Sequence, residues 1–193
     1  ADREKATEGL KKYIKSIIRQ GTEEFLNNQT VRFSPLVPLR NEYRKALYNT
    51  SFSPVKCFYE IRERIEKGLS FRLLGLPGLG KTRMVGEGFR GNDNDVYYCD
   101  CKTTQSQTVQ NAVERLLTQR TKSKQVVILD NCDQKLCGYT TDMIHENGYN
   151  CQLITIHYDP SEKADTGIEV VSIKVEDSVE TVNAMVNAVQ DMP

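Results

Sequence analysis

The sequence predicts a three-layer α/β fold in which helices cover both faces of a five-stranded parallel sheet. From residue 70 onward, five short apolar segments alternate with segments of helical period. This alternation is typical of a parallel sheet built from right-handed crossovers. A glycine-rich loop joins the first apolar segment to the first helix. The third apolar segment, residues 125–130, is hydrophobic almost throughout, as expected for a strand covered on both faces.

Residues 1–36 precede this core as a predicted helical extension and linker, and residues 37–193 form the core domain. Apolar side chains in residues 1–20 recur every three or four positions, which is the period of an amphipathic helix. A second short helix follows a Thr22 cap, and Pro35 and Pro38 mark the connector. Further helices are expected from Arg40 and over residues 54–68.

The core elements follow in chain order. The predicted strands are residues 71–74, 96–100, 125–130, 151–157 and 169–174. The predicted helices are residues 81–89, 108–120 and 178–189, and residues 142–147 lie in a further helix. We expect the sheet order fifth, first, fourth, third, second strand, with one strand inserted between the first and the third.

Residues 75–82 read G-L-P-G-L-G-K-T, which is a complete G-x-x-x-x-G-K-T phosphate-binding loop. Glycines let successive backbone N–H groups turn toward an anion, and the next helix aims its positive end at the same place. Lys81 is expected to reach the β- and γ-phosphates, and the Thr82 hydroxyl to hold Mg²⁺. The predicted nucleotide contacts are Gly75, Pro77, Gly78, Leu79, Gly80, Lys81, Thr82 and Arg83. The loop predicts a P-loop NTPase that binds ATP or ADP with Mg²⁺.

Two acidic residues complete the predicted catalytic set of Lys81, Asp130 and Asp133. Asp130 ends the buried third strand, where a carboxylate beside the loop can help to fix the metal ion held by Thr82. Asn131 follows it and, being an amide, cannot accept a proton. Asp133 is the candidate that polarises water, and a role as a helix cap or turn residue is the alternative.

Polar residues also end the fourth predicted strand. Thr155 and His157 are expected beside the loop, where a polar group can sense the γ-phosphate, although a lone histidine at a strand end is often a surface residue. Four of the six cysteines flank strand ends as C-x-C and C-x₄-C, a pattern in which buried thiols are commoner than zinc.

The composition gives little sign of a charged partner. Lysine plus arginine and aspartate plus glutamate each number 26, so the net charge is zero and no broad field attracts nucleic acid or an acidic membrane. No apolar run approaches the roughly 20 residues that span a bilayer, and no signal peptide opens the chain. We therefore expect a cytoplasmic protein with reduced thiols.

Four blocks resemble the nucleotide-binding domain of the STAND ATPases, which include the NB-ARC and NACHT groups. They are residues 75–83, residues 126–133 (V-V-I-L-D-N-C-D), residues 153–157 (L-I-T-I-H) and residues 170–180 (V-V-S-I-K-V-E-D-S-V-E). Asp130 and Asp133 resemble the two acids of NACHT-like members. Residues 37–42 resemble the segment whose arginine, here Arg40, lies at the adenine end of the site, but Leu39 replaces the family's glycine. Thr155 and His157 stand where the family has Thr-Thr-Arg, so the sensor arginine is missing.

The resemblance implies a nucleotide-dependent signalling switch with slow ATP hydrolysis. In such a switch ADP holds a resting state, and ATP favours self-association that triggers attached effector and sensor domains in a longer chain. An AAA-like remodelling motor is one alternative, but Arg120 is the last arginine, which leaves no arginine finger near the fourth strand. A small-molecule kinase and a scaffold that binds ADP without hydrolysing ATP are the others.

Overall fold

The computed structural model describes residues 35–39, 52, 54–91, 95–119, 124–159, 167–173, 179 and 183. All of them belong to one compact unit, Pro35–Pro193. The predicted helices of residues 1–36, the helix expected from Arg40 and nearly all of the helix expected at residues 178–189 lie outside the described residues. The boundary between extension and core therefore stays a prediction.

Up to the fifth strand the described elements alternate between strand and helix, and the sixth strand is the next described element after it. The strands are β1 (Val37–Pro38), β2 (Phe71–Leu74), β3 (Val96–Asp100), β4 (Gln125–Asp130), β5 (Cys151–His157) and β6 (Glu169–Ser172). The helices are α3 (Lys56–Glu66), α4 (Lys81–Gly88), α5 (Ser106–Gln119) and α6 (Gln134–Glu146). No helix among these described elements has the length and apolar character needed to cross a bilayer.

The sheet has six strands in the order β1-β3-β4-β5-β2-β6, and all neighbours from β3 to β6 pair in parallel. The predicted order of the five parallel strands is confirmed. The prediction of only five strands is wrong, because β1 pairs antiparallel with β3 at the sheet edge, with Val37 opposite Tyr98. The sequence did not predict β1 because a two-residue strand has no detectable period and because proline is rare in strands. An edge strand tolerates proline, since its solvent-facing edge needs no backbone N–H donor.

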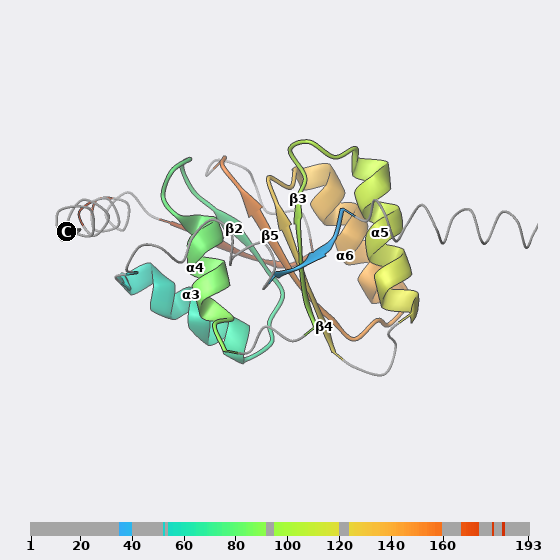
Figure 1. The fold of residues 1–193 in the computed structure, drawn as a ribbon, viewed down its shortest axis with the longest axis horizontal. Helices are drawn as coiled ribbons and strands as arrows, with labels where there is room; N and C mark the ends of the chain where they lie inside the picture. Colours follow the sequence, from blue (N-terminus) through green and yellow to red (C-terminus); the bar gives the residue numbers. More distant parts are fainter. Residues whose placement is uncertain are drawn as a thin grey trace, which may run out of the picture. The chain divides into compact units, whose positions relative to one another are not determined.

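Two helical layers cover the sheet. Helices α3 and α4 lie on one face and α5 and α6 on the other (Figure 1). Alternate residues of β4 enter the two cores: Val126 and Ile128 pack on the α3–α4 side, and Val127 and Leu129 on the α5–α6 side. Burial on both faces explains why β4 is apolar until Asp130.

Helix α6 begins eight residues before the expected 142–147 segment. Its buried side contains Thr140 and Thr141 as well as Leu136 and Ile144, so the apolar period is weak in the sequence. The threonine hydroxyls donate to the carbonyl oxygens of Leu136 and Cys137 one turn earlier, at 2.7 and 2.9 Å. These bonds satisfy the buried polar groups and let a half-polar face pack against the sheet.

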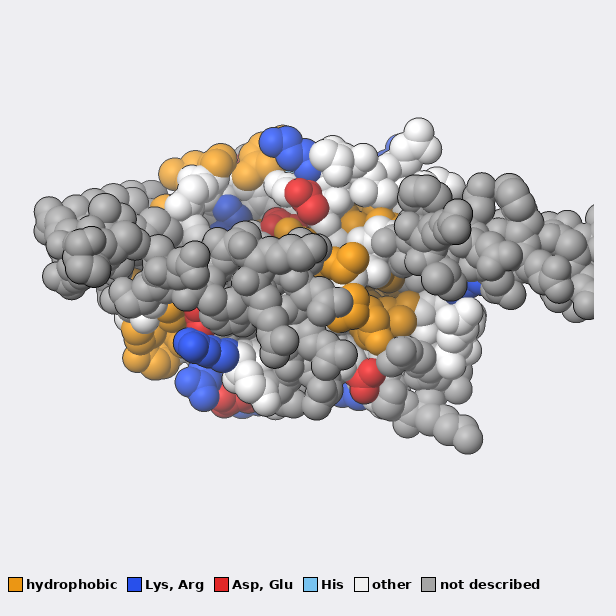
Figure 2. Space-filling model, viewed as in Figure 1, with side chains coloured by type: hydrophobic (Ala, Val, Ile, Leu, Met, Phe, Trp, Pro, Cys, Tyr) orange, Lys and Arg blue, Asp and Glu red, His pale blue; other side chains and the backbone are white. Residues whose placement is uncertain are grey.

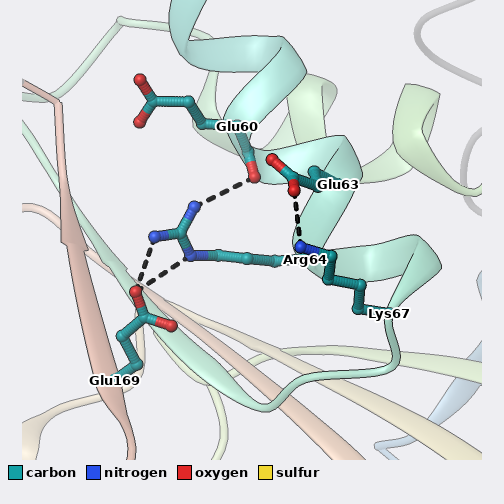
Figure 3. Close-up of polar contacts among 5 residues, drawn as sticks. All are labelled: Glu60, Glu63, Arg64, Lys67 and Glu169. Atoms are coloured by element: carbon teal, nitrogen blue, oxygen red, sulfur yellow. Dashed lines mark hydrogen bonds and ion pairs between the residues drawn. The ribbon is translucent and has the colours of Figure 1, made fainter.

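An ion pair joins α3 to the edge strand β6 (Figure 3). The Arg64 guanidinium donates to Glu169 Oε1 from Nη2 at 2.6 Å and from Nε at 3.2 Å, and its Nη1 reaches the Glu60 carbonyl at 3.2 Å. The bond to Arg64 lowers the pKa of Glu169, and the bond to Glu169 raises the pKa of Arg64. Glu63 of α3, by contrast, pairs with Lys67, the C-cap residue of the same helix.

We expect Glu169→Gln to lower the free energy of unfolding by less than about 1 kcal/mol at neutral pH, because the Glu169 side chain is 49% exposed and solvent screens the pair. The pKa of Glu169 in the folded protein lies below its ordinary value of 4.5. The stability lost in Glu169→Gln is therefore greatest above pH 4.5 and disappears as the pH falls through the folded-state pKa. Urea unfolding from pH 3 to pH 7 measures it. Glu63→Gln is the control and leaves the α3–β6 contact intact; a pH-independent loss in Glu169→Gln would contradict the account.

Candidate phosphate-binding site

The loop between β2 and α4 has the backbone that an anion site needs. Gly78 and Gly80 adopt φ angles of 81° and 70°, in the left-handed region that favours glycine. Gly80 is the N-cap of α4, and its carbonyl accepts the first helical bond, from Met84 N at 2.9 Å. The N–H groups of the first α4 turn are thus directed at the loop, where the helix dipole favours an anion.

Lys81 lies folded across this loop. Its side chain is buried, and Nζ donates to the carbonyl oxygens of Gly75 and Leu76, both at 2.8 Å. Burial lowers the pKa of Lys81, and the charge of Asp130 opposes that shift. The ammonium is therefore incompletely compensated by its surroundings, and an anionic phosphate in the loop would stabilise its charged form.

Thr82 and Asp130 meet opposite the lysine. Thr82 Oγ1 donates to Asp130 Oδ2 at 2.6 Å, and the backbone N–H of Asn131 donates to Oδ1 at 2.8 Å. A hydroxyl and a carboxylate are the oxygen donors that Mg²⁺ takes beside substrate phosphates, so these two residues fit the metal expected from the sequence.

A cavity of about 840 Å³ opens over this cluster. Its walls come from the loop and α4 (Pro77, Gly78, Gly80, Lys81, Thr82), from the ends of β3 and β4 (Cys101, Lys102, Asp130, Asn131, Asp133) and from the end of β5 (Ile156, His157, Tyr158). Figure 2 shows hydrophobic side chains at the upper edge of the domain, with acidic and basic ones beside them. Leu76 and Tyr158, at the ends of β2 and β5, are among the exposed hydrophobic residues.

Asp133 has one of the two roles that the sequence left open, that of a helix cap. Its Oδ1 accepts from Leu136 N at 2.7 Å, which makes it the N-cap of α6. The residue is also exposed and lines the cavity. The cap fixes where the carboxylate stands, and its role toward water stays a prediction.

The structure separates the two sensor candidates. His157 lines the cavity, with its ring centroid 4.3 Å from that of Tyr158. Thr155 is fully buried, and its hydroxyl contacts Arg72 Nη1 at 3.0 Å and Cys137 Sγ at 3.4 Å. The side chain of Thr155 is therefore not part of the cavity wall.

Three predicted contacts also lie outside the cavity wall. Leu79 is buried in the core between the sheet and α3–α4, and Gly75 packs near Ile173 and Lys81. Arg83 pairs with Glu87 at 3.7 Å and lies 5.4 Å above the ring of Phe52. Arg40 lies outside the described residues.

Sequence reasoning missed two polar residues around the site, the buried Arg72 and the half-buried Tyr98. Arg72, in the middle of β2, is 1% exposed and donates from Nη2 to the Cys132 carbonyl at 2.9 Å, so it ties β5 to the loop after β4. Tyr98 of β3 donates to Asp130 Oδ2 at 3.0 Å. An arginine inside an apolar strand was visible as a signal, whereas nothing in the sequence distinguished Tyr98 from Tyr97.

Three cysteines gather where β3 and β4 end. Hydrogen bonds with the side chains of Cys132 and Cys99, together with burial, raise the pKa of the Cys101 thiol. All six cysteines of the chain are free thiols. No three cysteine, histidine or acidic residues in the described part of the chain are placed to hold a metal ion.

Comparison with known proteins gives structural similarity alone. No family model matches the sequence, and no curated protein matches it significantly. The chain is similar to a structure of C. elegans PCH-2 (TM-score 0.40, 15% identity, 60% of this chain and 39% of that one). It is also similar to a point variant of Thermotoga maritima RuvB (TM-score 0.45, 12% identity, 70% of this chain and 49% of that one). The chain thus spans less than half the length of either protein, and the fold assignment comes from its own sheet order and loop.

We expect Thr155→Val to lower the free energy of unfolding by about 1–3 kcal/mol, because valine keeps the shape but removes the acceptor of a buried Arg72 N–H group. ADP and ATP affinities are expected to stay unchanged, since the hydroxyl does not line the cavity. Urea unfolding and nucleotide titration measure the two effects, with the exposed Thr118→Val as control. Unchanged stability, with weakened ATP binding, would show that Thr155 acts in the site instead.

Proposed function

We propose that this chain is an ATP- and ADP-binding P-loop NTPase domain of the ASCE class, which carries an additional strand between the loop strand and the strand of the metal acid. The main support for this proposal is that Lys81, Thr82 and Asp130 lie together at the N-terminus of α4. Strand β5 lies between β2 and β4, as that class requires.

Each residue has a role that follows from its position. The loop amides and the α4 N-terminus bind the phosphates, and Lys81 exchanges its carbonyl partners for phosphate oxygens. Thr82 and Asp130 hold Mg²⁺, which neutralises charge on the phosphates when bound. Asp133 orients water toward the phosphate end of the cavity, and His157, which lines the same cavity, contacts the nucleotide.

A STAND-like signalling switch with low turnover is the activity we favour for this site. Its support is the resemblance of the four sequence blocks and the cap that Asp133 forms on α6, which leaves its carboxylate only partly available to water. In that scheme ATP favours self-association of the domain in the cytoplasm, and effector and sensor domains in a longer chain respond. The same cap favours the runner-up function, a scaffold that binds ADP and does not hydrolyse ATP.

We expect Lys81→Ala to abolish ATP and ADP binding at concentrations that saturate the wild type, because the phosphates lose their main cationic partner. Titration with fluorescent ADP measures this, and Lys67→Ala, which removes an exposed lysine of the α3 pair, is the control. Wild-type affinity in Lys81→Ala would refute phosphate binding by the loop.

We expect Asp133→Asn to retain nucleotide affinity and the α6 cap, since asparagine caps as well as aspartate, and to slow single-turnover phosphate release at least about tenfold through loss of the carboxylate. Asp142→Asn, an exposed change on the same helix, is the control. Unaltered release would remove Asp133 from the chemistry, and no release from the wild type would favour the scaffold.

A further inference from the structure

The carboxylate of Asp130 accepts hydrogen bonds from α4, from β3 and from its own following peptide. Three donors reach it: Thr82 Oγ1 and Tyr98 Oη at Oδ2, at 2.6 and 3.0 Å, and Asn131 N at Oδ1, at 2.8 Å. Thr82 is a proposed metal ligand and Asn131 N belongs to the adjoining peptide. Among the described residues, Tyr98 therefore supplies a side-chain hydrogen bond to Asp130 without being a proposed metal ligand.

The sheet register explains how Tyr98 reaches this position. Strand β3 lies parallel to β4, with Tyr98 opposite Ile128 and Asp100 opposite Asp130. Tyr98 packs against the same core cluster as Ile128, on the α3–α4 side of the sheet, which is the side from which α4 presents Thr82. A tyrosine side chain is long enough to lean along its strand by the two residues that separate Ile128 from Asp130.

Packing limits the freedom of this tyrosine. Its ring is partly buried against the core cluster that includes Val96 and Ile128, and its backbone pairs with Val37 of β1. Tyr98 thus presents its hydroxyl from the sheet, independently of α4, which carries Thr82.

We propose that Tyr98 is a positioning residue for the metal acid, an inference that rests on the proposed function. A hydroxyl that gave a lone pair to Mg²⁺ could still donate its proton to Asp130, so Thr82 would be shared between the metal ion and the carboxylate. Tyr98 would then be the second side-chain donor that keeps Oδ2 in place. Partners of this kind orient metal-binding carboxylates, and their removal typically costs about 10- to 100-fold in metal affinity.

The test is Tyr98→Phe, which removes the hydroxyl and keeps the ring. Binding of fluorescent ADP is measured across a Mg²⁺ titration from EDTA to excess metal. We expect the Mg²⁺ concentration for half-maximal effect to rise about tenfold, while ADP affinity in EDTA and the melting temperature stay close to the wild-type values. Full affinity is expected to return at high Mg²⁺.

Tyr97→Phe is the matched control, because Tyr97 precedes Tyr98 on β3 but packs on the α5–α6 side of the sheet. We expect it to follow the wild-type Mg²⁺ curve. A wild-type curve in Tyr98→Phe would overturn the inference, as would an equal loss of ADP affinity with and without Mg²⁺, which marks a general structural effect. If wild-type protein binds no ADP at any Mg²⁺ concentration, the proposed function itself fails, and that result is distinct from both.

Discussion

The contact between the Thr82 hydroxyl and the Asp130 carboxylate is the interaction on which the site depends. It joins the first turn of α4, the helix that follows β2, to the end of β4, and β2 and β4 are not neighbours in the sheet. Strand β5 lies between β2 and β4, so the loop and the acid face each other across one strand. A sheet order with β2 next to β4 would change this separation and with it the space for a phosphate and a metal ion. The order of the strands is therefore a condition of the chemistry.

Buried and half-buried polar side chains maintain this arrangement from within the sheet. Arg72 joins the hydroxyl of Thr155 on β5 to the Cys132 carbonyl beyond β4, and Tyr98 joins β3 to Asp130. Burying such groups costs free energy unless their hydrogen bonds are made. Because the partners lie on the strands and loops that line the cavity, the hydrogen bonds that satisfy these side chains also fix the spacing of the strand ends. The loop between Asp130 and Asp133 is held at Cys132 in the same way.

The sequence predicted the parts of this structure that repeat a period or a motif. The five parallel strands follow from their apolar runs, their order from the single strand expected between the loop and the acid, and the loop from its glycines. It did not predict β1, because two residues have no period, or the first turns of α6, whose buried threonines look polar until their bonds to backbone carbonyls are seen. The sequence predicted that Thr155 and His157 lie together in the site. Thr155 lies two residues before the end of β5, where its hydroxyl contacts Arg72, whereas His157 ends the strand and lines the cavity. The contact of Tyr98 with Asp130 could not be predicted from the sequence, because it depends on the register of β3 against β4.

A crystal structure of the complex with ADP and Mg²⁺ tests the central claim most directly. We expect the phosphate oxygens to lie in the loop, with Lys81 Nζ bound to them instead of to the carbonyl oxygens of Gly75 and Leu76. We expect Mg²⁺ beside Thr82 Oγ1 and the Asp130 carboxylate. A nucleotide bound elsewhere, or phosphates in the loop with no metal ion beside Thr82 and Asp130, would contradict this expectation.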